Sequence, residues 1–432
     1  MSESTPEQLP TEKPEGLKRT LGLPDLLFFG ITNILGSGAA NLAGPTILAA
    51  RQYYPEVIAA VTGLLVGSSK TYAVAHEAYQ TNDSESRIIA DEIGPWAAVG
   101  TQVGIVGYSI LSIAVGLLFI TRIFCAGASW LFQVMVALQL AILLIVVGVL
   151  GIDINKSVVN FTSALFVFVL GAVGLIGLSM AVAGPAMQNI AVGPGGELHI
   201  GKAFLYVFFI LAGFDVIIKL TEETRDPVSV LPTAMYGSNV ISALLLVGVC
   251  VAFVALVPLR GRGGIDGGSF HNVLADISDA WFGKGTGLNM DVAVGLFILV
   301  STFIQYVGVT RYIYSVIKGK DGAVVEWWRE LNTRSAPHRI MLAVGALLFG
   351  AIFINNIDRL VASADLFLIV LLAAVGWSAA RRVWTEGKRI PWVESGTTLG
   401  LLGMFGLAGR AVFEREHVHH HTWTGVRKVG GG

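Results

Sequence analysis

The chain has 432 residues, of which 54% are hydrophobic and only 14% are charged. A typical soluble protein carries about 25% charged residues, so the composition excludes a soluble, disordered or disulfide-stapled protein and indicates a polytopic membrane protein. The net charge of −1 gives no reason to expect a nucleic-acid partner. Cys125 and Cys250 lie in apolar runs, so neither a disulfide framework nor a metal site is predicted.

Residues 1–17 are polar and rich in Pro and Glu, which predicts a disordered tail. The apolar runs that follow are long enough to cross a bilayer, which takes about 20 helical residues. They are continuous rather than alternating, so they predict helices and not barrel strands. About 11–12 transmembrane helices are expected, and the visible spans cover residues 21–50, 56–79, 95–121, 129–151, 158–184, 202–220, 231–258, 288–310, 339–355, 358–380 and 395–413.

Lys and Arg gather in alternate loops, which predicts the orientation because cytoplasmic loops are enriched in these residues. The N-terminal tail is predicted to be cytoplasmic because it carries Lys13, Lys18 and Arg19. The loops that follow residues 310 and 380 are also rich in Lys and Arg and are placed on the same side. We expect a multi-pass protein of the plasma (cell) membrane. Residues 381–432 are predicted to form the terminal spans and a polar tail, whose histidines 417, 419, 420 and 421 are not expected to form a metal site.

The first span is interrupted in its middle by Gly36-Ser37-Gly38. Each glycine costs about 1 kcal/mol in a helix interior relative to Ala, so the helix is predicted to unwind here. Unwound backbone at this depth must be buried in protein or line a cavity, and the following half-helix would offer N–H groups to an anion. The alternative is that the glycines form a notch for helix packing.

The sixth span contains Gly213 in its middle, followed by Phe214 and Asp215. A carboxylate inside an apolar run predicts a functional, cavity-facing position, and the alternative is a buried hydrogen bond between helices. Paired interruptions in matching spans of two halves are typical of secondary transporters. The offset of five spans predicts a five-plus-five inverted repeat, with the first repeat over residues 18–200 and the second over 201–380.

Four stretches, in the same order along the chain, resemble the amino acid–polyamine–organocation (APC) superfamily of permeases. Leu17–Ala50 resembles the first span of these proteins with its Gly-Ser-Gly triplet, and Phe208–Pro232 is similar to their sixth span. Ile89–Trp96 resembles the start of their third span, and Ser301–Gly322 resembles their eighth. The resemblance implies an amino acid permease with the five-plus-five fold and discontinuous spans 1 and 6.

The resemblance also implies a substrate site. Backbone N–H groups of Gly36, Ser37 and Gly38 would hold the substrate carboxylate. Backbone carbonyls near Ile34, Ile210 and Ala212 would accept from its ammonium group, with Gly213 at the break and Asp215 beyond it. Phe214 occupies the place of an aromatic lid over the substrate. Gating ion pairs are expected from three residues at the cytoplasmic end, where a solvated charge cluster is the alternative: Glu222, Glu223 and Arg311.

No cofactor is predicted, and Na⁺ and H⁺ are the two candidate coupling ions. Ser301 and Thr302 lie where sodium-coupled relatives of the family place hydroxyl ligands, although such hydroxyls often bond their own helix backbone instead. Many proton-coupled members carry a Lys in span five, and here no Lys or Arg lies between Val158 and Met187.

These patterns predict a secondary active transporter that moves an amino acid or a related amine, such as a polyamine, by alternating access. The substrate would bind between the broken spans 1 and 6. The alternative function is a transporter-like receptor that binds an amino acid without moving it. A membrane-embedded enzyme is not expected, since the spans show neither a His/Glu metal constellation nor a Ser/Lys dyad. The sequence does not indicate which amino acid is carried, or the oligomeric state.

Overall fold

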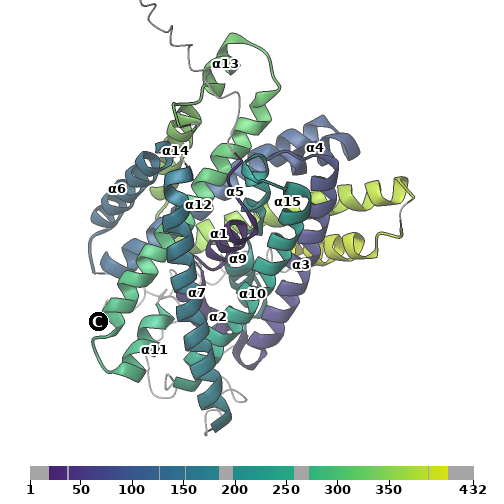
Figure 1. The fold of residues 1–432 in the computed structure, drawn as a ribbon. Coiled ribbons are helices and arrows are strands. Elements are labelled where there is room, and N and C mark those ends of the chain that lie inside the picture. The colour runs from purple at the N-terminus through teal and green to yellow at the C-terminus, as the bar shows by residue number, and fades with distance from the viewer. Residues whose placement is uncertain are drawn as a thin grey trace, which may run out of the picture.

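The computed structural model describes residues 19–36, 38–125, 127–150, 152–183, 198–256, 272–334, 336–387 and 389–406. The predicted tail, Ser37 and the C-terminal histidines lie outside these ranges. In the described residues the regular secondary structure is helical, apart from one isolated β-bridge between Leu21 and Thr224. The helices pack into one bundle (Figure 1). This confirms the prediction of an all-helical fold.

In the first half of the chain, the long helices follow the five predicted spans closely. A short helix that the sequence pattern did not predict, α4, occupies the loop between the second and third spans. The helices are α1 (Leu23–Leu35), α2 (Ala39–Ala50), α3 (Tyr54–Ala78), α4 (Ser84–Glu92), α5 (Pro95–Cys125), α6 (Trp130–Val149) and α7 (Ile152–Ala183).

The second half also follows the predicted spans and adds two short loop helices, α11 and α13. A helix over residues 392–406 corresponds to the eleventh predicted span. The other elements are α9 (Ile200–Leu211), η2 (Phe214–Val216), η3 (Ile218–Glu223), α10 (Pro227–Leu256), α11 (Val273–Phe282), α12 (Gly287–Lys318), α13 (Ala323–Arg329), α14 (His338–Ile352) and α15 (Ile357–Thr385).

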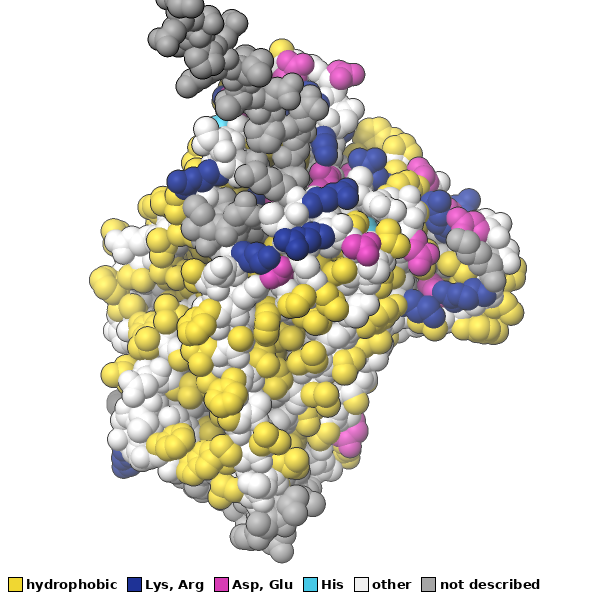
Figure 2. Space-filling model, viewed as in Figure 1, with side chains coloured by type: hydrophobic (Ala, Val, Ile, Leu, Met, Phe, Trp, Pro, Cys, Tyr) yellow, Lys and Arg dark blue, Asp and Glu magenta, His cyan; other side chains and the backbone are white. Residues whose placement is uncertain are grey.

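The outer surface of the bundle is apolar. Eight helical segments of the described chain are long and apolar enough to cross a membrane, and two shorter apolar helices accompany them. Large side chains such as Phe168 and Leu175 are more than 70% exposed on this surface. Hydrophobic side chains cover the middle and lower part of the face in Figure 2. Such a surface is stable in lipid and not in water, so the protein is a multi-pass integral membrane protein.

Both predicted interruptions are real breaks in the helices. The first span divides into α1 and α2 around Gly36–Gly38, and the sixth ends its α-helix at Leu211 and continues through the 3₁₀ turns η2 and η3. The broken spans therefore lie in matching positions of two five-span halves. The fold is the predicted five-plus-five arrangement. The repeat boundaries at residues 200 and 380 stay predictions.

The two broken spans are tied together at one end. The backbone N–H groups of Thr20 and Leu21 donate to the carbonyl of Glu223 at 2.9 and 3.0 Å, and Arg225 N–H donates to the carbonyl of Leu21 at 3.0 Å. The chain just before α1 thus pairs with the chain just after η3. This pairing holds the start of span 1 against the end of span 6.

Candidate functional site

The break in span 1 packs tightly against two other helices. A Cβ atom added at Gly36 would lie 2.0 Å from the side chain of Ser301 in α12, and one at Gly38 would lie 2.8 Å from Cγ1 of Ile210 in α9. Real Cβ atoms essentially never approach other heavy atoms this closely. Glycine at both positions is therefore required for α12 and α9 to reach the break.

The break in span 6 depends on a third glycine. Gly213 has a φ of +114°, a conformation that glycine adopts without the steric cost that a Cβ brings. Its carbonyl accepts a hydrogen bond from Nδ2 of Asn33 at 2.7 Å. Since Asn33 belongs to α1, this bond joins the two broken spans directly at their interruptions.

The helix ends at the breaks offer backbone groups of opposite polarity. The first N–H groups of α2 and the last carbonyls of α9 lie at helix ends, where the regular i→i−4 pattern leaves such groups to other partners; the Asn41 N–H, for example, donates to the Gly38 carbonyl at 3.2 Å. They carry the partial positive and negative charges of the helix termini. Gly38 at the start of α2 contacts Ile210 near the end of α9, so the two kinds of terminus lie side by side. This arrangement suits a small zwitterion.

A small cavity lies beside the two breaks. Its volume is about 10 Å³, which is room for about one water molecule and not for an amino acid. Of the predicted substrate residues, Ala212 and Gly213 line it, whereas Ile34, Gly36, Gly38, Ile210, Phe214 and Asp215 do not, and Ser37 lies outside the described residues. The lining residues are Asn33, Tyr108, Ser112, Phe209, Ala212, Gly213, Gln305 and Asp365.

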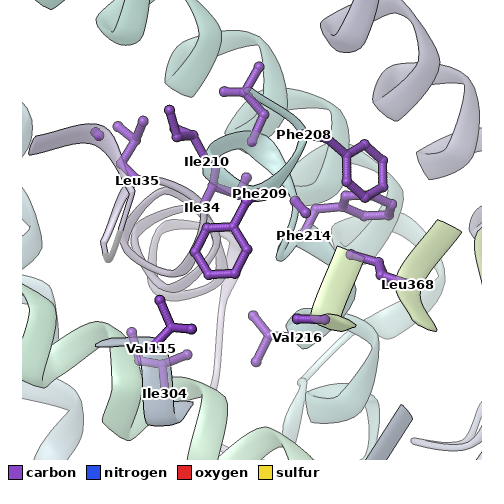
Figure 3. Packing of buried hydrophobic residues seen from close by; sticks show 14 of the residues in the cluster. Ile34, Leu35, Val115, Phe208, Phe209, Ile210, Phe214, Val216, Ile304 and Leu368 are labelled. Atoms are coloured by element: carbon purple, nitrogen blue, oxygen red, sulfur yellow. The ribbon is translucent and has the colours of Figure 1, made fainter. Parts of the chain in front are cut away.

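Apolar side chains fill the space around the breaks. Figure 3 shows Ile34 of α1 lying near Phe209 and Ile210 of α9. Phe214 is 1% exposed, and its ring packs edge-to-face on Tyr72 with centroids 5.5 Å apart. In this conformation Phe214 is therefore held in the core, and its role as a lid stays a prediction.

Asp215 forms a buried ion pair that the sequence analysis did not anticipate. Its Oδ2 lies 2.5 Å from Nζ of Lys219, and both side chains are 1% exposed. Its other oxygen, Oδ1, accepts a hydrogen bond from the Tyr108 hydroxyl at 3.0 Å. Asp215 is thus connected to the cavity wall through Tyr108. The hydrogen bond from Tyr108 of α5 agrees with the alternative interpretation, a buried hydrogen bond between helices. The ion pair with Lys219 is an additional contact.

Asp365 is the acidic residue of the cavity wall, and the sequence analysis missed it. It is 1% exposed, and its Oδ2 has no hydrogen-bond partner. The sequence does contain a pattern that could have identified it, because Asp365 interrupts the apolar run of the tenth span just as Asp215 interrupts that of the sixth. Gln305 also lines the cavity, and its Nε2 is likewise without a partner. These two groups are available to a polar ligand.

The candidate sodium ligands are buried in α12 with different contacts. The Thr302 hydroxyl donates to the carbonyl of Leu299 in its own helix at 2.9 Å, as the alternative interpretation expects. Ser301 packs against Gly36 at the break in span 1. Their role in ion coupling stays a prediction.

The three predicted gating residues meet at the end of span 6. Nε of Arg311 lies 2.6 Å from Oε1 of Glu223, and both side chains are 2% exposed. Glu222 pairs with Nζ of Lys318 at 2.8 Å and accepts from the Ser315 hydroxyl at 2.9 Å. These contacts fasten η3 to α12. The cluster is thus mostly buried rather than solvated, while its gating function stays a prediction.

The fold and the paired breaks define a membrane transporter rather than an enzyme. Residues 92–410 match the family model described as amino acid permease, and the chain belongs to this family. It is 25% identical to an uncharacterized transporter of Mycobacterium tuberculosis, over 92% of this chain and 88% of that protein. It is 24% identical to the branched-chain amino acid permease BcaP of Bacillus subtilis, over 84% of this chain and 81% of that one.

The fold is also similar to a solved structure. The crystal structure of MhsT in complex with L-phenylalanine superposes with a TM-score of 0.60 at 14% sequence identity, covering 91% of this chain and all of that chain. At this identity the likeness concerns the fold alone. It confirms the five-plus-five architecture with discontinuous first and sixth spans.

Proposed function

We propose that the protein moves an amino acid across the cell membrane by alternating access, with the substrate bound between the broken spans. The observation that carries this proposal is the joining of the two breaks at the cavity through Asn33 and Gly213. In this proposal the substrate carboxylate lies at the start of α2, and its ammonium group lies at the end of α9. The names of the family and of BcaP support an amino acid as the substrate.

The small cavity supports a moving site. An amino acid cannot enter about 10 Å³, so binding requires the walls to separate. The walls come from both broken spans and from α5, α12 and α15. Separation of α1 and α9 from the other three helices would open the site to one side at a time.

The distribution of charge supports a cytoplasmic assignment for one end of the bundle. Lys and Arg gather at the upper end in Figure 2, which carries α4 and α13 in Figure 1. Arg87, Lys318, Arg329, Arg381 and Arg382 belong to this end. By the positive-inside rule this end faces the cytoplasm, and the chain just before α1 lies at this end, because Thr20 and Leu21 pair with Glu223.

The test is uptake of a radiolabelled mixture of the proteinogenic L-amino acids into proteoliposomes, followed by assay of each compound singly. Counterflow against the same unlabelled compounds is measured in parallel. We expect saturable uptake of at least one amino acid. Binding without flux would instead identify a receptor, and neither binding nor flux for any amino acid or polyamine would overturn the proposal.

A further inference from the structure

Glu85 is a buried acid that the substrate site does not use. It is the second residue of α4, it is 0% exposed, and neither carboxylate oxygen has a hydrogen-bond partner. Burying an ionised carboxylate without a partner is far more costly than burying the neutral acid. Glu85 therefore carries a proton in this conformation.

The charged groups around Glu85 are already paired with one another. Lys219 contacts Asp215 at 2.5 Å and Ser109 at 3.4 Å, and Asp83 is paired with Arg87 at 2.9 Å. At the far end of α4, Arg381 of α15 lies 3.6 Å from Glu92. Three charged groups interact electrostatically with Glu85, namely Lys219, Asp215 and Asp83. The hydroxyls of Tyr72 in α3 and Tyr312 in α12 are in turn affected by the charge of Glu85.

The start of α4 is fastened to α12 on either side of Glu85. The Ser315 hydroxyl donates to Oδ1 of Asp83 at 2.9 Å, and Ser86 is hydrogen-bonded to the Tyr312 hydroxyl. Asp83 and Ser86 flank Glu85 in sequence. If α12 and α4 separate when the cytoplasmic end opens, Glu85 becomes accessible to water.

We propose that Glu85 binds the proton that drives transport, holding it while the cytoplasmic end is closed and releasing it to the cytoplasm when that end opens. This inference rests on the proposed function and names H⁺ as its coupling ion. The released proton passes from the carboxyl group to water, and the carboxylate left behind is then solvated.

Polar contacts run from the cavity to Lys219, and the charge of Lys219 acts across space on Glu85. Tyr108 lines the cavity and donates to Asp215, which is paired with Lys219. An ionised Glu85 competes with Asp215 for the single ammonium group of Lys219. Loss of the proton therefore changes the partners of Asp215 and Tyr108, and this connects the protonation of Glu85 to the substrate cavity.

The direction of the pH dependence follows from the burial. Burial raises the pKa of Glu85 from its ordinary 4.5 to about 8. Relative to the open conformation, the closed conformation therefore has its full stabilisation from the Glu85 carboxyl group below about pH 4.5. It loses this stabilisation as the pH rises through about 8. Between these values, each opening of the cytoplasmic end releases a proton. In this proposal Glu85 takes up its next proton from the extracellular side by way of the cavity, and an inward proton gradient therefore favours inward movement of substrate.

The experiment compares wild type with Glu85→Gln in proteoliposomes that contain a pH-sensitive dye. The vesicles are alkaline inside and acidic outside, and the probe is the mixture of proteinogenic L-amino acids. In wild type, we expect substrate to accumulate severalfold and to speed acidification of the lumen. In Glu85→Gln, we expect counterflow within about twofold of wild type, no accumulation and no substrate-dependent acidification. Glu77→Gln is the matched control, because Glu77 is an exposed acid at the end of α3, and it should behave as wild type.

Glu85→Asp keeps the carboxyl group and should retain substrate-dependent acidification. Accumulation and acidification by Glu85→Gln equal to wild type would overturn the proposal. The proposal would also be overturned if a sodium gradient drove transport by the wild type without proton movement. This measurement does not depend on the folding of any variant. Absence of counterflow in wild type would instead overturn the proposed function itself.

Discussion

The two broken spans occupy matching positions in the two halves but are built from different chemistry. Span 1 breaks between two helices of 13 and 12 residues, and its interruption is held by glycines that contact α12 and α9. Span 6 breaks after a 12-residue helix and continues as 3₁₀ turns that carry the Asp215–Lys219 pair. One break is uncharged, and the other carries a buried ion pair.

If transport is coupled to protons as proposed, this difference separates two tasks, the binding of substrate and the response to the proton. The uncharged break presents backbone groups, which suit the constant carboxylate of any amino acid. The charged break can change with protonation, since its ion pair is linked to Tyr108 on one side and lies within the influence of Glu85 on the other. Variants of the two spans should therefore fail in different ways.

The largest effect is expected from breaking the ion pair of span 6. Lys219→Met leaves the Asp215 carboxylate buried without its cationic partner, which typically costs about 3–5 kcal/mol. The thermal unfolding midpoint of the purified protein in detergent should fall strongly. The double variant Asp215→Asn/Lys219→Met should recover most of the loss. Lys284→Met, at an exposed lysine, is the control, and equal destabilisation of all three variants would contradict the pairing.

A smaller loss of stability is expected at span 1, with a larger effect on binding. Gly36→Val forces a side chain into Ser301, and overpacking of this kind costs about 1–3 kcal/mol. If the displacement of α12 costs substrate binding a comparable free energy, we expect uptake to fall about tenfold or more, because about 1.4 kcal/mol corresponds to a tenfold change in affinity. Gly63→Val in α3 is the control, because a Cβ there meets nothing within 4 Å. Equal uptake by the two variants would show that the triplet does not shape the site.

Gly213 tests the junction between the two breaks. Gly213→Ala and Gly283→Ala both place a side chain at positive φ, which costs about 1–3 kcal/mol. Only at Gly213 does the new Cβ also meet Asn33, at 2.7 Å, whereas at Gly283 it meets nothing. We therefore expect Gly213→Ala to lower both the unfolding midpoint and uptake further. A larger effect at Gly283 would be inconsistent with the Asn33 contact.

The smallest effect is expected at the exposed end of span 6. The Lys318 side chain is 46% exposed in its pair with Glu222, and exposed pairs contribute about 0.2–1 kcal/mol. Lys318→Ala should thus barely change the unfolding midpoint, and the difference from wild type should shrink further at high salt. A loss as large as that of Lys219→Met would show that this pair is buried in the working protein.

Much of the fold was predictable because apolar runs and their interruptions are local properties of the sequence. The breaks at Gly36–Gly38 and Gly213 were found for this reason, from the Gly-Ser-Gly triplet in one span and from Gly213 followed by Phe214 and Asp215 in the other. The ends of the long helices agreed with the predicted spans to within several residues. The short helix α4 was missed because its charged sequence resembles a loop, and α13 because seven residues are too few to show a helical period.

The cavity and the ion pair were harder to predict because they depend on distant contacts. Tyr108, Gln305 and Asp365 come from three different helices, and nothing local indicates that they share one cavity. Lys219 lies four residues from Asp215, yet the pairing depends on both side chains being buried by their neighbours. Nothing local singles out Glu85, because its flanking residues are polar and only the packing of α4 buries it.

The size of the cavity has a consequence for the membrane as a whole. A space of about 10 Å³ holds neither a hydrated ion nor a file of water molecules. In this conformation the cavity beside the breaks is therefore closed to ions as well as to substrate, so it gives ions no passage through the bilayer.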